Sequence, residues 1–142
     1  MNEYCVFCEI LAGKEPASFL YRDEICAAFM DIQPVNPGHL LVIPNRHARS
    51  LAELEEETGA QLFRVGRRLA GALRQSGVRC EGVNLFLADG AAAGQEVFHV
   101  HLHVIPRYAG DGFTLRFSPA YYQLPGRSEL DLLAGQIRSS LA

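Results

Sequence analysis

Residues 99–107 read HVHLHVIPR, so a histidine stands at every second position, at His99, His101 and His103. Strict two-residue alternation predicts a β-strand, because successive side chains of a strand point to opposite faces. The three imidazoles are therefore expected on one face and aliphatic side chains on the other. Burying a neutral imidazole without a hydrogen-bond partner costs about 1–3 kcal/mol, so such a row needs partners from other segments. The pattern predicts a functional surface.

A single metal ion does not suit all three histidines. A strand rises about 3.3 Å per residue, which separates the α-carbons of His99 and His103 by roughly 13 Å. Zinc binds its nitrogen ligands at about 2.0–2.1 Å, so two neighbouring histidines of the row could share an ion while the third reaches it only with difficulty. The geometry indicates that the row is divided between tasks.

The N-terminal pair Cys5 and Cys8 has the two-residue spacing of zinc-binding cysteines. No second pair of this kind follows, so two more ligands would have to come from histidines, with His47 and His99 as candidates. A redox-active or inert cysteine pair fits the same spacing, and the residues alone leave these alternatives open.

The composition predicts one globular domain that binds neither nucleic acid nor a membrane. The chain has 142 residues, a formal net charge of −3 and 49% hydrophobic residues. That charge argues against a broad basic surface for nucleic acid, and the arginines at 64, 67 and 68 follow the pattern of a solvated helix face. No hydrophobic run is long enough to span a membrane, and the N-terminus lacks the features of a signal peptide. A cytoplasmic location, with reduced cysteines, is expected.

The order of the expected elements predicts an α+β fold with a mainly antiparallel sheet, since strands and helices do not alternate. Strands are expected at residues 18–21, 25–30, 39–43, 83–87 and 99–104. Helices are expected at residues 5–12, in a long segment that ends near Gly77, and from Ser128 onward. Capping boxes are expected at Ser50–Glu53 and Thr58–Gln61, and an irregular segment at residues 108–127.

Together, these motifs resemble the histidine triad (HIT) family of nucleotide hydrolases and transferases. The histidine stretch, preceded by Gly94-Gln95, is similar to the family signature. Residues 28–32 and 37–44, followed by His47, are similar to the family's N-terminal half. The resemblance implies an antiparallel five-stranded sheet with one long helix and short N- and C-terminal helices. It also implies a homodimer whose sheets join. We expect a single HIT domain over residues 1–142, with its core at about 5–107 and a C-terminal extension at 108–142.

The cysteine pair makes the chain similar to the zinc-containing bacterial branch of this family. The resemblance implies a structural zinc ion with four ligands, Cys5, Cys8, His47 and His99. Zinc bound to His99 would stiffen the strand that carries the other two histidines, so its implied role is structural and not that of a Lewis acid.

The other two histidines of the row are the implied catalytic residues. By resemblance, His101 attacks the α-phosphorus of a nucleotide, of the dinucleoside polyphosphate or adenosine 5'-phosphoramidate type, and water cleaves the nucleotidyl–histidine intermediate. His103 is the implied hydrogen-bond partner of the phosphate. The other implied nucleotide- and phosphate-binding residues are Phe29, Asp31, Ile32, His39, Gly94 and Gln95.

Two positions depart from the family pattern. Ala88 stands where relatives often have Asn or Gln near the substrate, and Glu96 stands where some have Ser or Thr near the leaving group. An alternative function is a nucleotide-binding regulatory module with vestigial catalysis. Another is a mononuclear metalloenzyme with the histidine row on a catalytic metal. Detection of a nucleotide covalently bound to the protein would favour the hydrolase over the regulatory module. Loss of activity after metal removal, with the protein still folded, would favour the metalloenzyme.

Overall fold

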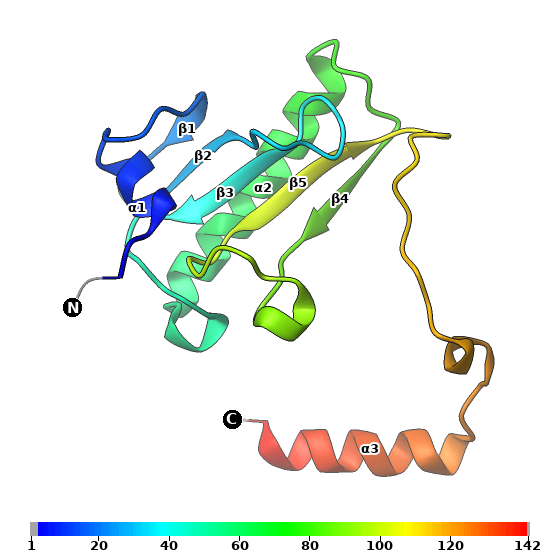
Figure 1. Ribbon diagram of the computed structural model, residues 1–142. Coiled ribbons are helices and arrows are strands. Elements are labelled where there is room, and N and C mark those ends of the chain that lie inside the picture. The colour runs from blue at the N-terminus through cyan, green and yellow to red at the C-terminus, as the bar shows by residue number, and fades with distance from the viewer. Residues whose placement is uncertain (1–2, 142) are drawn as a thin grey trace. The chain divides into compact units, whose positions relative to one another are not determined.

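The computed structural model describes residues 3–141, and its centre is a five-stranded sheet (Figure 1). The strands, in the order β1-β2-β3-β5-β4, all pair antiparallel with their neighbours. Their bounds are Phe19–Arg22 for β1, Cys26–Met30 for β2, Leu40–Pro44 for β3, Gly82–Phe86 for β4 and Leu102–Arg107 for β5. The expected α+β fold with a five-stranded antiparallel sheet is confirmed.

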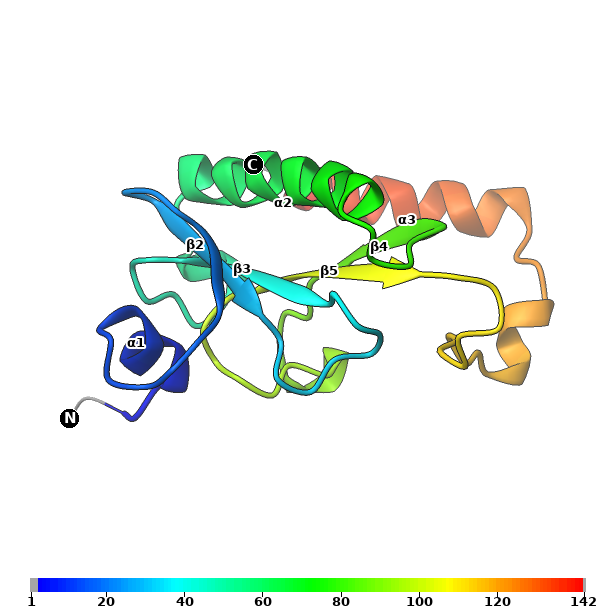
Figure 2. The same ribbon diagram turned by 90° about the horizontal axis from the view of Figure 1, so that it is seen from above.

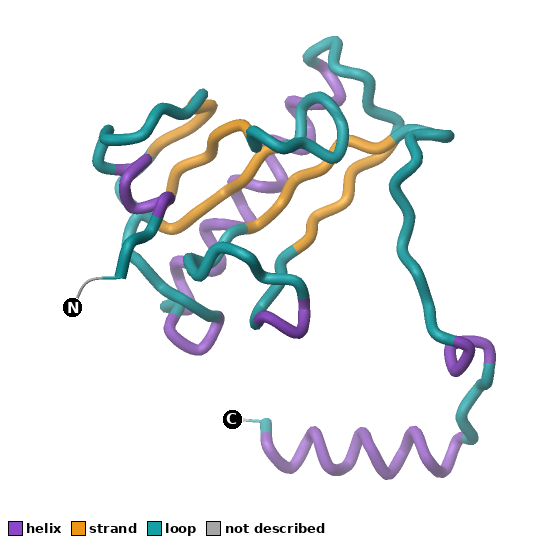
Figure 3. Tube along the Cα trace, viewed as in Figure 1, coloured by secondary structure: helices purple, strands orange, loops and turns teal. Residues whose placement is uncertain are grey.

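The chain divides into two compact units, one that ends at Asp111 and one that begins at Gly112. The first unit holds the sheet, the short helix α1 (Val6–Leu11) and the long helix α2 (Glu56–Gln75). The second holds a short 3-10 turn and the helix α3 (Arg127–Ser140), and most of the chain before α3 is loop, as expected (Figure 3). Among the described residues, no helix is both long and apolar enough to cross a bilayer.

The two long faces of the sheet are covered by different helices, as Figure 2 shows for α2 and α1. Val100, Leu102 and Val104 belong to the apolar cluster that includes Leu62 and Val65 of α2. The cluster on the opposite side contains Phe7 and Ile10 of α1 together with four strand residues, Ala27, Phe29, Leu41 and Ile43. The alternation in the histidine stretch thus sends its aliphatic side chains toward α2 and its imidazoles toward α1.

Two local expectations are corrected by the structure. β5 begins only at Leu102, so His99 and His101 precede its regular ladder. His99 is fully buried, because α1 covers the imidazole face of the sheet through Phe7.

The capping box expected at Thr58–Gln61 is wrong, because α2 already begins at Glu56. Its Gln61 side chain instead donates to Oδ2 of Asp23, 2.9 Å away in the β1–β2 turn, so a tertiary contact outweighs the local pattern. In the other expected box, Ser50 makes no capping bond through its side chain, although Glu53 accepts from the backbone N–H of Arg49 at 2.8 Å.

Candidate functional site

The three histidines of the row lie together on the α1 side of the sheet. The ring centroids of His101 and His103 are 4.9 Å apart. The ring of Phe7 lies edge-on to both His99 and His101, at 5.8 and 5.2 Å. This aromatic contact from α1 was not expected from the sequence, because nothing in the local pattern around Phe7 distinguishes it from an ordinary core residue.

The tautomer of His101 is set by the backbone of the same segment, two residues before it. Its Nδ1 atom lies 2.8 Å from the carbonyl oxygen of His99, which can only accept a hydrogen bond. The ring proton of neutral His101 therefore sits on Nδ1, and Nε2 keeps its lone pair. A nucleophilic imidazole requires this arrangement.

The tautomer of His103 is set by His39, which immediately precedes β3. The backbone N–H of Val35 donates to Nδ1 of His39 at 3.0 Å, so neutral His39 carries its proton on Nε2. That Nε2 atom lies 2.9 Å from Nδ1 of His103 and 3.4 Å from a carboxylate oxygen of Asp31. His103 accepts on Nδ1, which leaves an N–H on Nε2 as a donor.

Burial keeps these two rings neutral at pH 7. Burial lowers the pKa of His103 to about 4, and the adjacent His101 and His39 act in the same direction. Burial also lowers the pKa of His39, against the opposing effect of Asp31. Neutral rings hold the chain of hydrogen bonds in one direction, from Val35 to His103.

A glycine turn places His39 immediately before β3. Gly38 has a φ of +100°, in the left-handed region that favours glycine. A β-carbon at this position would lie 2.8 Å from a methyl carbon of Val78. The turn is closed by the N–H of His39, which donates to the carbonyl of Asn36 at 3.0 Å. Backbone conformation and tight packing therefore both favour glycine immediately before His39.

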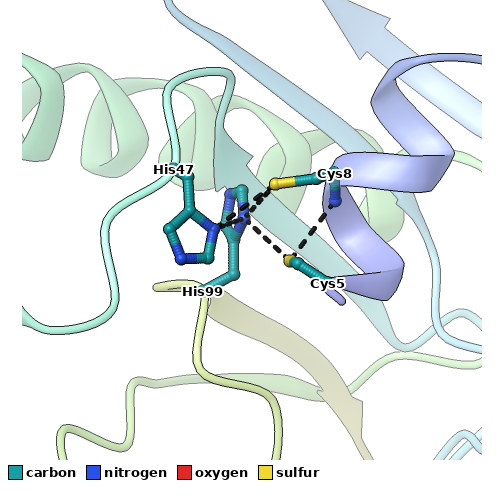
Figure 4. A group of neighbouring side chains, drawn as sticks. All are labelled: Cys5, Cys8, His47 and His99. Carbon is teal, nitrogen blue, oxygen red and sulfur yellow. Dashed lines mark hydrogen bonds between the residues drawn. The ribbon is translucent and has the colours of Figure 1, made fainter. Parts of the chain in front are cut away.

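A second cluster joins the row to the N-terminus, and its members are Cys5, Cys8, His47 and His99 (Figure 4). Nε2 of His99 lies 2.8 Å from the carbonyl oxygen of Pro44, so this nitrogen carries the ring proton and Nδ1 is the free donor atom. Nδ1 of His99 lies 3.4 Å from Sγ of Cys5 and 3.2 Å from Nδ1 of His47. Sγ of Cys8 lies 3.3 Å from Nδ1 of His47 and 3.6 Å from Nδ1 of His99.

These separations match the edges of a tetrahedron around zinc. Bond lengths of about 2.3 Å to sulfur and 2.05 Å to nitrogen give tetrahedral edges of roughly 3.5 Å between sulfur and nitrogen and 3.3 Å between two nitrogens. The donor set of two thiols and two imidazoles is one that zinc prefers. Without a cation, burial and the neighbouring Cys5 raise the pKa of the Cys8 thiol to about 11, so a bound cation would have to favour the thiolate. A cavity of about 270 Å³ borders Cys5 and His47.

A third grouping, Asp31, His39 and His103, also brings potential metal ligands together. Its two ring nitrogens are 2.9 Å apart, which is a hydrogen-bond distance and shorter than the tetrahedral edge of about 3.3 Å. Nδ1 of His39 already accepts a hydrogen bond from Val35, so Nε2 of His39 carries the ring proton and donates it to Nδ1 of His103. The grouping is best explained as hydrogen-bonded side chains.

The other expected nucleotide-binding residues have diverse environments. Phe29 is buried with its ring against Phe7, whereas Ile32 is 96% exposed. Gly94 has a φ of +92° and Gln95 is buried. The amide of Gln95 donates to the carbonyls of Arg49 and Val97 and accepts from the N–H of Gly90. These bonds hold the loop of residues 90–97, and the nucleotide contacts of all four residues stay predictions.

Phe86 is a neighbour of the histidine row that the sequence did not indicate. Its ring centroid lies 5.7 Å from that of His103, and its side chain is 44% exposed on β4. Strand pairing explains the contact, because Phe86 is directly opposite His103 in the register of β4 and β5. Only the register reveals this neighbour.

A sequence model of the HIT domain matches residues 12–110. The chain belongs to the HIT family. A crystal structure of a HIT family protein from Bacillus anthracis superposes with a TM-score of 0.89 at 35% identity, covering 100% of both chains. A zinc-bound histidine triad family protein from Mycobacterium smegmatis is similar at a TM-score of 0.75 and 41% identity, covering 96% of this chain and 97% of that chain. The chain is also 36% identical over 107 residues to Adenylylsulfatase HINT3 of Arabidopsis thaliana, covering 75% of this chain and 54% of that protein.

Proposed function

We propose that this HIT protein is a nucleotidyl hydrolase or transferase that acts at the α-phosphate through a covalent intermediate on His101. One observation carries the proposal: the 2.8 Å contact between Nδ1 of His101 and the carbonyl oxygen of His99 leaves Nε2 unprotonated. The substrate class is a dinucleoside polyphosphate or an adenosine 5'-phosphoramidate. Membership of a family of nucleotide-binding proteins supports this class.

The reaction has two displacements at phosphorus. In the first, Nε2 of His101 forms a bond to the α-phosphorus while the bond between phosphorus and the leaving group breaks. In the second, water forms a bond to phosphorus, the nitrogen–phosphorus bond breaks and the water releases a proton. Positioning and neutralisation of the phosphate oxygens supply most of the acceleration in phosphoryl transfer. The Nε2–H of His103 is the proposed donor to the phosphate or to the leaving group.

The nucleotide would be held by residues around this pair. We assign Phe29, Asp31 and Ile32 to the nucleoside, and His39, Gly94, Gln95 and His103 to the phosphate. His39 acts through His103, whose Nδ1 it faces at 2.9 Å. Gln95 acts through the loop that it ties to Arg49, and the positive φ of Gly94 lets the backbone approach an anion closely.

We further propose that Cys5, Cys8, His47 and His99 hold a structural zinc ion, as in the zinc-containing bacterial branch. When bound, zinc would supply a cross-link between the N-terminus and the histidine row, and no step of the reaction requires it. His99 connects the two sites, since its Nδ1 faces the cysteines and its carbonyl orients His101. We also propose a single HIT domain over residues 1–142, a cytoplasmic location and a homodimer.

The decisive test is detection of the adduct together with a substrate panel. Purified protein is incubated with dinucleoside polyphosphates, adenosine 5'-phosphoramidate and adenylyl sulfate, products are separated by chromatography, and intact-protein mass spectrometry detects a bound nucleotide. We expect His101→Ala to reduce turnover by about 10⁴-fold or more and to abolish the adduct, while zinc content and circular dichroism stay unchanged. Full turnover by this variant would refute the assigned nucleophile. Nucleotide binding without turnover or adduct in the wild type would favour the regulatory module.

A further inference from the structure

Asn36 lies in the segment between β2 and β3, three residues before His39. Its side-chain amide donates to the carbonyl oxygen of Pro106 at 2.9 Å and to Oδ2 of Asp111, also at 2.9 Å. An asparagine amide has two N–H groups, so these two bonds use both of them. The side chain of Asn36 therefore attaches this segment to the end of β5 and to the turn that follows it.

The carboxylate of Asp111 is itself held by several donors. Its Oδ2 atom also accepts from Nε of Arg107 at 2.6 Å and from the backbone N–H of Tyr108 at 3.2 Å. Its Oδ1 atom accepts from Nη2 of Arg107 at 3.0 Å, so guanidinium and carboxylate share two bonds. Nη1 of Arg107 donates to Oδ1 of Asn84 on β4 at 2.6 Å. Asn36 thus donates to a charged acceptor whose position β4 and β5 fix.

The backbone around Asn36 determines how the His39 ring is bonded. The N–H of Val35, the preceding residue, donates to Nδ1 of His39 at 3.0 Å. The carbonyl oxygen of Asn36 accepts from the backbone N–H of His39 at 3.0 Å. Both groups therefore lie next to the side chain that is anchored on β5. The His39 ring in turn donates from Nε2 to Nδ1 of His103 at 2.9 Å.

The anchor lies where the regular pairing of the strands has ended. β5 carries both His103 and Pro106, three residues apart. The ladder between β3 and β5 ends with Leu40 opposite Val104, so it does not extend to the segment before β3. The side chain of Asn36 supplies hydrogen bonds to β5 beyond that point. We define the Asn36 clamp as the residues Asn36, Pro106, Arg107 and Asp111, all of which lie in the first unit.

We propose that Asn36 and Asp111 are positioning residues for the reaction at His101. Their hydrogen bond fixes the segment before β3 against the end of β5 and so preserves the proton arrangement of the His39–His103 pair. Both residues act through His39 and not on the substrate. Their role in the reaction rests on the proposed function, whereas their effect on the proton arrangement does not.

The test compares three full-length variants by nitrogen NMR of the imidazole rings and by hydrolysis kinetics. Asn36→Ala removes both amide donors, and Asp111→Asn keeps the shape of the acceptor but removes its charge. Gln61→Ala is the matched control, because it removes an amide-to-carboxylate hydrogen bond of the same length, 2.9 Å, between α2 and the β1–β2 turn. Circular dichroism and urea denaturation establish that each variant is folded and how much stability it has lost.

We expect both clamp variants to show mixed tautomers of His39 and His103. Their kcat should fall about tenfold, the equivalent of one hydrogen bond to a charged group. Gln61→Ala should keep the wild-type tautomers and kcat although it also loses a hydrogen bond. Combining Asn36→Ala with His39→Leu should lower kcat no further than His39→Leu alone, because the effects of residues that act through one another are not additive.

Two results would overturn the proposal. One is a wild-type tautomer of His39 and His103 in the clamp variants, and the other is a loss of kcat in Asn36→Ala that multiplies with that of His39→Leu. If Asn36→Ala does not fold, Asp111→Asn decides by the same criteria, since it preserves the volume of the side chain. Absence of turnover and adduct in the wild type would refute the proposed function, whereas the NMR measurement requires no turnover and tests the clamp separately.

Discussion

Replacing His39 by leucine removes the donor that faces Nδ1 of His103. The 2.9 Å contact with His39 is the only hydrogen bond found for the His103 ring in the described structure. Without it, Nδ1 of a partly buried ring loses its partner, and an unsatisfied polar group that is buried costs about 1–3 kcal/mol. His103 could then move its proton to Nδ1, where it no longer serves as a donor on Nε2.

This cost sets the expected loss of activity. At about 1.36 kcal/mol for each factor of ten in rate, we expect kcat/KM to fall about 5- to 150-fold in His39→Leu. His39→Gln retains an N–H donor of similar reach and should stay within about fivefold of the wild type. The Leu and Gln side chains have similar volumes, but only Gln can donate a hydrogen bond to Nδ1 of His103, so the two variants form a matched pair.

The assay combines hydrolysis kinetics with nitrogen NMR of the imidazole rings. We expect the wild type and His39→Gln to show His103 with its proton on Nε2, and His39→Leu to show a mixture of tautomers. Equal kcat/KM for the two variants, or an unchanged tautomer in His39→Leu, would refute the reasoning that His39 acts by orienting His103.

Three further predictions concern stability. Burial lowers the pKa of both His99 and His103 to about 4, so the unfolded state binds more protons than the folded state below the ordinary histidine pKa of 6.5. The metal-free protein should therefore lose about 3–6 kcal/mol of unfolding free energy between pH 6.5 and pH 4, as measured by urea denaturation, and a flat profile would contradict this. Cys8→Ser should lower the zinc content by mass spectrometry and the Tm by several degrees, and chelation of wild-type zinc should have the same effect, whereas Cys80→Ser should keep the metal. On α2, Gly66→Ala would place a β-carbon 2.9 Å from a methyl carbon of Leu102 and should cost about 1–3 kcal/mol, whereas Gly71→Ala meets no atom within 4 Å and should stabilise by about 0.5–1 kcal/mol.

Local patterns in the sequence were sufficient to predict which faces the histidine stretch presents. Alternation at residues 99–104 separates imidazoles from aliphatic side chains because the period of an extended chain is two, whatever surrounds it. The same kind of argument predicted the sheet and the long helix, since apolar periodicity reports directly on which side of an element is buried. The cysteine spacing likewise predicted a possible ligand pair, because two residues at this interval can share one ion.

Tertiary structure alone decided what each imidazole faces. The partners of the row come from segments far away along the chain: His39 is 64 residues from His103, and Cys5 is 94 residues from His99. Tautomers depend on these partners, and no periodic pattern specifies which atom of a distant ring lies within 3 Å. The register of β4 and β5 likewise decided that Phe86 lies beside His103. Sequence thus determined the side of the sheet on which the chemistry lies, while packing between distant segments determined which nitrogen atoms carry it.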